Sequence, residues 1–287
     1  MIVIRLIGGL GNQMFQYALG RNLAIINNTE FKLDITDLTK TDILNKHTIR
    51  DYELNHFQII ENIASVDEIN HFNKNNNRLS KLINRFRRYY RRPIVVEKQL
   101  SFDANIFKIR ENSYLQGYWQ SEEYFKEIRE ILLKEFKLKL YFRGNIQTIA
   151  NEIINSNSVS LHIRRGDYVN TYSDYYFILD NTYYLNAITY IRNKYTNTKL
   201  FVFSDDIEWA RKNLKDIENI TFVEQNKSYE DMYLMSLCKH NIIANSSFSW
   251  WGAWLNENDN RLVVAPKKWF KNESRIHNII PEKWIAL

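Results

Sequence analysis

Two hydrophobic patterns alternate along this chain. Short, almost wholly apolar runs are typical of parallel strands buried on both faces; they occupy 1–7, 158–163, 199–204, 220–225, 241–246 and 261–266, with weaker strand patterns at 30–34 and 113–118. Stretches with helical spacing lie between them, at about 12–26, 121–136, 182–195, 207–214, 229–240 and from 247 onward. The polar segment 51–92 also favours helix. Strands that alternate with helices predict parallel βαβ units.

This alternation stops near 140–150 and then restarts. The break predicts two α/β halves of Rossmann type, 1–145 and 146–287. The sequence contains no internal repeat and no low-complexity tract.

Composition narrows the chemistry. The single cysteine, Cys238, excludes a disulfide framework and a cysteine-based zinc site. The sequence has no D-x-D and no histidine–carboxylate spacing that suggests a metal site. Phosphate chemistry here would therefore rely on arginine and helix dipoles. The start of the sequence does not resemble a signal peptide, and no run of eighteen apolar residues occurs, so we expect a cytoplasmic protein, free or peripheral to the inner membrane.

The net charge of +6 is modest, but arginine is clustered in 84–92, which reads NRFRRYYRR. Arginines interleaved with aromatics favour contact with an anionic membrane surface or with nucleic acid. We favour the membrane, because nothing else in the sequence resembles a base reader; a solvated helical face is the alternative. The arginines of this basic stretch are Arg85, Arg87, Arg88, Arg91 and Arg92.

A buried strand ends in HIRRGD, 162–167. Ligands of open α/β sheets bind beyond the carboxyl ends of the strands. Side chains alternate along a strand, so His162 and Arg164 share a face and Arg165 points the other way. The guanidinium of Arg164 suits a phosphate, and Asp167 can orient it. A purely structural Arg–Asp pair is the alternative.

Two further strand ends add polar groups. Asp205 and Asp206 follow the strand at 199–204, where each can bind a guanine edge or ribose, or cap the next helix. The loop at the end of the strand 241–246 opens a helix whose free N–H groups form an anion site, with simple capping as the alternative. Its residues are Asn245, Ser246, Ser247 and Phe248. The three strand ends together suit a diphosphate attached to a base.

The first turn, GGLGNQMFQ at 8–16, also joins a strand to a helix. It resembles a dinucleotide fingerprint, but Met14 occupies the third glycine position. We expect its glycines to allow close backbone approach, with Asn12 and Gln13 facing a cleft.

Five motifs, GGLGNQMFQYALG, LQGYWQSEEYF, HIRRGDYV, FVFSDD and NSSFSWWGAWL, together resemble glycosyltransferase family 11, the α-1,2-fucosyltransferases of bacteria and animals. The resemblance implies a GT-B-like fold, with two Rossmann-type halves facing a cleft. It assigns acceptor binding to the half 1–145 and GDP-fucose binding to the half 146–287. It also implies that neither a cofactor nor a metal is required.

The resemblance also implies site residues. Arg164 is expected to bind the β-phosphate and Asn12 to lie near the reacting sugar; with Asp167 they form the catalytic set, although no general base is assigned. The donor-binding set is His162, Arg164, Asp205, Asn245, Ser246, Ser247, Phe248 and Gly11. The acceptor-binding set is Gln116, Tyr118 and Trp119.

The implied reaction is an inverting, metal-independent transfer of L-fucose from GDP-β-L-fucose to the 2-hydroxyl of a β-galactoside. We expect the acceptor to be a surface glycan such as O-antigen, free or lipid-linked. Alternatives are another linkage or donor sugar, or a non-catalytic nucleotide-sugar or glycan-binding protein. RNA binding through 84–92 is disfavoured, so no nucleic-acid partner is expected; a steep salt dependence of RNA affinity would support it.

Overall fold

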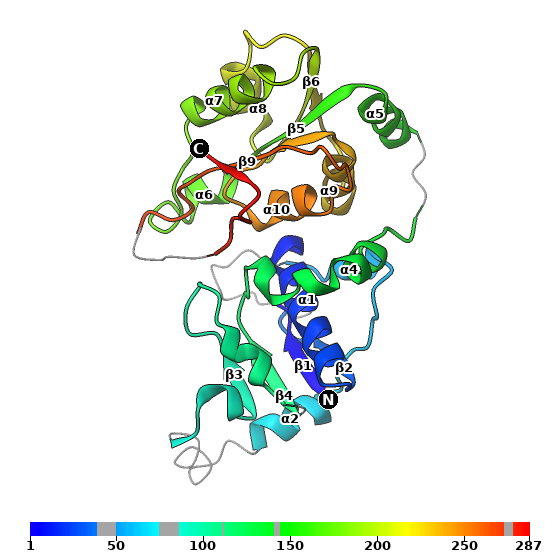
Figure 1. The fold of residues 1–287 in the computed structure, drawn as a ribbon, viewed down its shortest axis with the longest axis vertical. Coiled ribbons are helices and arrows are strands. Elements are labelled where there is room, and N and C mark those ends of the chain that lie inside the picture. Colours follow the sequence, from blue (N-terminus) through cyan, green and yellow to red (C-terminus); the bar gives the residue numbers. More distant parts are fainter. Residues whose placement is uncertain (39–49, 75–85, 111, 141–143, 273–277) are drawn as a thin grey trace. The chain divides into compact units, whose positions relative to one another are not determined.

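The computed structural model describes residues 1–38, 50–74, 86–110, 112–140, 144–272 and 278–287. The chain divides into two compact units. The first comprises Met1–Lys139 with Ile276–Ile279, and the second comprises Leu140–Arg275 with Ile280–Leu287. Each unit is built around one parallel sheet (Figure 1).

The sheet of the first unit has the strand order β2-β1-β4-β3, and all its neighbouring strands are parallel. Its strands are β1 (Ile2–Arg5), β2 (Phe31–Asp34), β3 (Ile94–Val96) and β4 (Ser113–Gln116). Its helices are α1 (Leu10–Ile26), α2 (Val66–Lys74) and α4 (Arg129–Glu135), with short 3-10 turns η1 (Leu54–His56), η2 (Tyr89–Arg91), η3 (Ala104–Lys108), η4 (Glu122–Tyr124) and η5 (Lys126–Ile128).

Helix α1 connects β1 to β2 and is buried on almost every side. A Cβ atom at Gly20 would lie 2.3 Å from Cε2 of Phe31, so glycine is what allows the helix to approach β2 this closely.

One secondary-structure expectation for this unit is wrong. Segment 121–136 is not one amphipathic helix, because Phe125, between η4 and η5, has a non-helical backbone with a φ of −152°. Tyr124 and Phe125 are both buried, and consecutive residues point about 100° apart on a helix. Of the polar segment 51–92, residues 75–85 lie outside the described residues; the described part includes α2 and the 3-10 turns η1 and η2.

The sheet of the second unit has the order β10-β9-β8-β5-β6-β7, again with parallel neighbours. Its strands are β5 (Asn157–Ile163), β6 (Thr198–Ser204), β7 (Ile220–Val223), β8 (His240–Ile242), β9 (Val263–Ala265) and β10 (Ile285–Ala286). Its helices are α5 (Asn145–Ile154), α6 (Gly166–Asn170), α7 (Asn181–Arg192), α8 (Ile207–Asn213), α9 (Ser228–Leu237) and α10 (Ser247–Trp254).

This order is that of a Rossmann fold, in which the connections reverse direction between β5 and β8. Val159, Leu161 and Ile163 of β5 pack with α7 and α8 in one hydrophobic core. Helices α9 and α10 cover the other face (Figure 1). Parallel sheets in both units confirm the predicted α/β class with two Rossmann-type halves.

Candidate functional site

Arg164 directly follows β5, at the point where the strand order reverses. Its Nη2 atom donates to Oδ2 of Asp167 at 2.8 Å, and its Nη1 lies 3.1 Å from Oδ2 of Asp205. Its guanidinium carbon is 5.6 Å from the centre of the Tyr168 ring. Two carboxylates and an aromatic face therefore hold one guanidinium, whose side chain is still 22% exposed.

The charges of this cluster follow from burial and from these partners. Burial lowers the pKa of Arg164, but the carboxylates of Asp205 and Asp167 outweigh it, so the pKa is raised and the guanidinium stays charged. Burial, with a further contribution from Arg164, lowers the pKa of His162 to about 3. His162 is therefore a neutral imidazole at physiological pH.

Asp205 fixes the turn that carries Arg164. Its carboxylate accepts the backbone N–H of Arg165 at 2.8 Å and that of Gly166 at 3.1 Å, in addition to the ion pair with Arg164. A Cβ atom at Gly166 would lie 2.9 Å from Oδ2 of Asp205. These contacts use most of the roughly four lone-pair positions of a carboxylate. The binding of guanine or ribose by Asp205 stays a prediction.

Asp206 and Arg165 point to the neighbouring helix α8. Asp206 caps this helix by accepting the N–H of Trp209 at 3.2 Å, and its Oδ2 lies 3.5 Å from Nε of Arg165. The guanidinium of Arg165 stacks 4.2 Å from the Trp209 ring centre. Of the two adjacent aspartates, Asp206 is thus the cap, and Arg165 points away from the Arg164 cluster.

The loop between β8 and α10 is held from below by a buried amide. The Nδ2 atom of Asn245 donates to the carbonyls of Phe177 and Trp269, each at 2.8 Å. Ser246 is the N-cap of α10, and its Oγ accepts the N–H of Phe248 at 3.4 Å. The expected capping by serine is therefore present. The first turn of α10 is a helix N-terminus at the carboxyl edge of the sheet.

Two contacts join this loop to the Arg164 cluster. The Tyr168 hydroxyl donates to the carbonyl of Asn245 at 3.0 Å, and the His162 and Phe248 rings are 5.4 Å apart. Ser247 and Phe248 are partly exposed at the start of α10. Nδ1 of His162 and Oδ1 of Asn245 are buried without a hydrogen-bond partner among the described residues.

The second unit therefore assembles a guanidinium, a helix N-terminus and unpartnered buried polar atoms at one strand crossover. Positive charge and free N–H groups at a helix start favour an anion, above all a phosphate. Across the described residues, no group of three or more His, Cys, Asp or Glu side chains is arranged to hold a metal ion.

In the first unit, the turn after β1 is shaped by glycine. Gly8 has a φ of +78°, and a Cβ atom there would lie 2.6 Å from Nδ2 of Asn12. Gln13 was expected to face a cleft, but its side chain is buried. Its amide donates to the carbonyls of Gly8 and Asp51 and accepts the N–H of Glu53.

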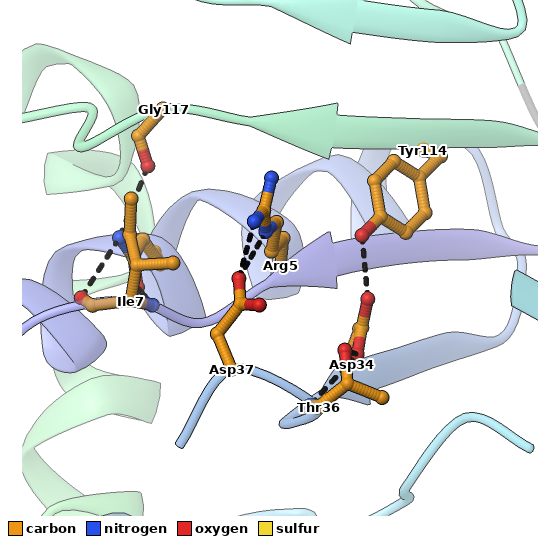
Figure 2. Close-up of polar contacts among 8 residues, drawn as sticks. Arg5, Ile7, Asp34, Thr36, Asp37, Tyr114 and Gly117 are labelled. Atoms are coloured by element: carbon orange, nitrogen blue, oxygen red, sulfur yellow. Dashed lines mark hydrogen bonds and ion pairs between the residues drawn. The ribbon is translucent and has the colours of Figure 1, made fainter. Parts of the chain in front are cut away.

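Figure 2 shows polar contacts that link strands β1, β2 and β4 and the segments that follow β1 and β2. Arg5 pairs with Asp37, while the buried Asp34 accepts the Tyr114 hydroxyl and both the N–H and hydroxyl of Thr36. Dinucleotide-binding Rossmann halves use an acidic residue near this position for ribose. Here hydrogen bonds from Thr36 and Tyr114 occupy the carboxylate of Asp34, which argues against a dinucleotide site at the glycine turn.

The candidate acceptor residues separate into surface and core. Tyr118 is 39% exposed, whereas Trp119 is 1% exposed and packs edge-on against Tyr124. Gln116 is partly exposed at the end of β4, and Gly11 is buried in the first turn of α1. Two polar residues that lock this region were not anticipated, Glu97 and Gln120.

Two units that each contain a Rossmann-type parallel sheet have the architecture of GT-B glycosyltransferases. The whole chain, residues 1–287, matches the model of "Glycosyl transferase family 11", and the chain belongs to that family. The family prediction from the five motifs is thereby confirmed.

Two bacterial relatives match over nearly their full lengths. The chain is 36% identical over 305 residues to an α-1,2-colitosyltransferase of Escherichia coli, covering 100% of this chain and 99% of the relative. It is 34% identical over 309 residues to the O-antigen biosynthesis glycosyltransferase WbnK of Escherichia coli, covering 98% of each. Among solved structures, NodZ α-1,6-fucosyltransferase from Bradyrhizobium, co-crystallised with GDP, matches with a TM-score of 0.52 and 14% identity, over 88% of this chain and 90% of NodZ. This likeness supports the fold alone.

Proposed function

We propose that the chain transfers L-fucose from GDP-β-L-fucose to the 2-hydroxyl of a β-galactoside, with inversion and without a required metal. The observation that carries the proposal is Arg164, fixed by Asp167 and Asp205 at the β5/β8 crossover of a Rossmann sheet. A guanidinium held this way presents its remaining N–H groups to the β-phosphate of a nucleotide sugar.

In the proposed reaction, the acceptor oxygen forms a bond to the anomeric carbon while the bond from that carbon to the β-phosphate oxygen breaks. GDP leaves with the electron pair, so negative charge grows on the phosphate. Arg164 and the N-terminus of α10 stabilise that charge before and during bond cleavage. The hydroxyl proton leaves to a base that we do not assign, because Asp167 is engaged with Arg164.

A second donor has a specific observation in its favour. The chain is 36% identical, over its whole length, to a protein named for colitosyl transfer. Colitose is the 3-deoxy counterpart of fucose, so one diphosphate site serves either donor. The two are separated by whatever contacts the 3-hydroxyl, because a site built to bind a hydroxyl rejects the analogue that lacks it. The galactoside acceptor rests on the motif resemblance, and O-antigen synthesis on the likeness to WbnK.

The test is GDP release in EDTA from GDP-fucose and from GDP-colitose, with and without a panel of β-galactosides such as lactose. We expect acceptor-stimulated release with GDP-fucose. Faster release from GDP-colitose with the same acceptors would move the assignment to colitosyl transfer. Tight GDP binding without release from either donor would contradict catalysis on these substrates, and dependence on added Mg²⁺ would contradict metal independence.

We also propose that the protein acts at the cytoplasmic face of the inner membrane, on a lipid-linked acceptor. No helix in the described segments is long and apolar enough to cross a bilayer. The described part of the basic stretch supports peripheral contact: Phe86 is 84% exposed, and Arg87, Arg88 and Arg91 are exposed beside it. Arg92 is half-buried, and Arg85 lies outside the described residues.

An exposed aromatic side chain with exposed arginines next to it in the sequence suits the interface of an anionic bilayer. Co-sedimentation with vesicles that contain phosphatidylglycerol tests the membrane proposal. Phe86→Ala together with Arg87→Ala and Arg88→Ala should release the protein from these vesicles. Unchanged sedimentation of the triple variant, or equal binding to neutral vesicles, would refute it.

A further inference from the structure

The turn that follows β4, residues 117–120, has an unusual backbone. Trp119 has a φ of +56°, in the left-handed region that bulky residues rarely adopt. Such conformations persist only where the surroundings impose them, and they cluster at binding and catalytic sites. The burial of the Trp119 ring supplies one of the constraints.

Glu97 supplies the second constraint. It directly follows β3, and its carboxylate accepts the N–H of Tyr118 at 2.7 Å and that of Trp119 at 3.0 Å. A Cβ atom at Gly117 would lie 2.4 Å from Cβ of Glu97, so glycine is what admits the carboxylate. Gln16 of α1 donates to the Gly117 carbonyl at 3.0 Å. Three contacts therefore hold the turn in place: the carboxylate of Glu97 after β3, the amide of Gln16 in α1, and the buried ring of Trp119.

The pinned turn delivers an amide to the start of α1. Nε2 of Gln120 donates to Oδ1 of Asn12 at 2.8 Å. Within the described residues, no hydrogen bond uses Nδ2 of Asn12 or Oε1 of Gln120. One is a donor and the other an acceptor, and a sugar hydroxyl both accepts and donates. The bonded amide pair thus matches a single hydroxyl group.

The same turn carries Tyr118, whose side chain is 39% exposed. The carboxylate of Glu97 accepts the backbone N–H of Tyr118, which holds the backbone of this residue in place. A partly exposed aromatic ring can pack against the apolar face of a pyranose, as amphipathic rings do at other interfaces.

We propose that the 117–120 turn is a preorganised sugar-binding element of the acceptor site, in which Gln120 and Asn12 bind a hydroxyl and Glu97 is the positioning residue. Tyr118 packs against the sugar ring in this element. The inference rests on the proposed function, because it describes the acceptor side of the same transfer. Burial of the Glu97 carboxylate, which raises its pKa, fits a residue that is kept for its two backbone bonds.

The test compares acceptor KM, kcat, GDP affinity and melting temperature for Glu97→Gln and Gln120→Ala at saturating donor. Glutamine offers one acceptor oxygen where the carboxylate offers two, so one N–H of the turn loses its partner. We expect acceptor KM to rise about tenfold to a hundredfold in both variants, as small misplacements of binding groups do. GDP affinity should stay within twofold. Glu130→Gln, whose side chain is 83% exposed, is the matched control and should behave as the parent.

Each outcome is decisive. If the parent enzyme transfers fucose and both variants keep acceptor KM within twofold, the sugar-binding element is refuted while the proposed function stands. If the parent transfers no fucose, the proposed function itself fails. If Glu97→Gln does not fold, Gln120→Ala and Tyr118→Ala decide alone, because neither removes the carboxylate that holds the backbone; unchanged acceptor KM in both overturns the proposal.

Discussion

Replacement of Arg164 by lysine isolates the geometry of the proposed phosphate ligand from its charge. In the parent protein, one guanidinium contacts Asp167 through Nη2 at 2.8 Å and Asp205 through Nη1 at 3.1 Å. The planar fork makes both contacts and still directs N–H groups elsewhere. Arg164→Lys keeps a positive charge, but a single ammonium cannot satisfy both carboxylates and a phosphate in the same arrangement.

The magnitude follows from the role of one preorganised donor to developing charge. Loss of such a donor lowers kcat by about 10²–10³, which corresponds to about 2.7–4 kcal/mol of transition-state stabilisation. Because the charge grows as GDP leaves, kcat should fall more than the affinity for GDP-fucose. Asp205 keeps its bonds to the backbone of Arg165 and Gly166, so the turn should stay folded.

Acceptor-stimulated GDP release measures kcat, and thermal unfolding checks the fold. Arg211→Lys is the matched control, because Arg211 also pairs with a carboxylate in the second unit but lies half-exposed on α8. We expect Arg211→Lys to release GDP at the parent rate. A kcat for Arg164→Lys within threefold of the parent, in a folded protein, would refute the role of Arg164.

Three further results are expected. Gly166→Ala places a Cβ atom 2.9 Å from Oδ2 of Asp205, so kcat should fall about tenfold through displacement of the turn, and an unchanged kcat would contradict this. Burial raises the pKa of Asp231 from 3.8 to about 6, so the folded chain binds the extra proton and loses stability as pH rises through that window. The melting-temperature gain of Asp231→Asn should therefore be larger at pH 7 than at pH 4, and an equal gain at both would count against it. With its pKa lowered to about 3 by burial, His162 should show no NMR titration between pH 5 and 8.

Much of the fold is readable from sequence because burial on both faces leaves an apolar run. Strands β5 and β6 were predicted within one residue at each end for this reason. Strand β3 was missed, since only Val95 of its three residues is fully buried. The helix expected at 121–136 failed because tertiary packing, including the contact of Phe125 with Phe15, draws adjacent aromatics inward.

The candidate site was readable only in part. Strand ends point to ligands, so Arg164 and the loop at 245–248 could be singled out, and the structure brings them together through Tyr168. Asp205 accepts backbone N–H groups of the turn after β5, whereas Asp206 accepts one in α8. This difference cannot be predicted from two residues that are adjacent in the sequence. The role of Glu97 could not be predicted, because its hydrogen-bond partners follow it by about twenty residues in the sequence. They are brought close by the pairing of β3 with β4, and the hydrophobic pattern did not predict β3.

The most direct test of the proposed function is the linkage in the product. The protein should be incubated in EDTA with lactose and GDP-fucose labelled with ¹³C in the sugar, and the product examined by heteronuclear NMR. We predict an α-configured fucosyl anomeric proton that correlates across the glycosidic bond with C2 of galactose. A β-configured product, or a correlation to any other carbon of the acceptor, would contradict inverting α-1,2 transfer.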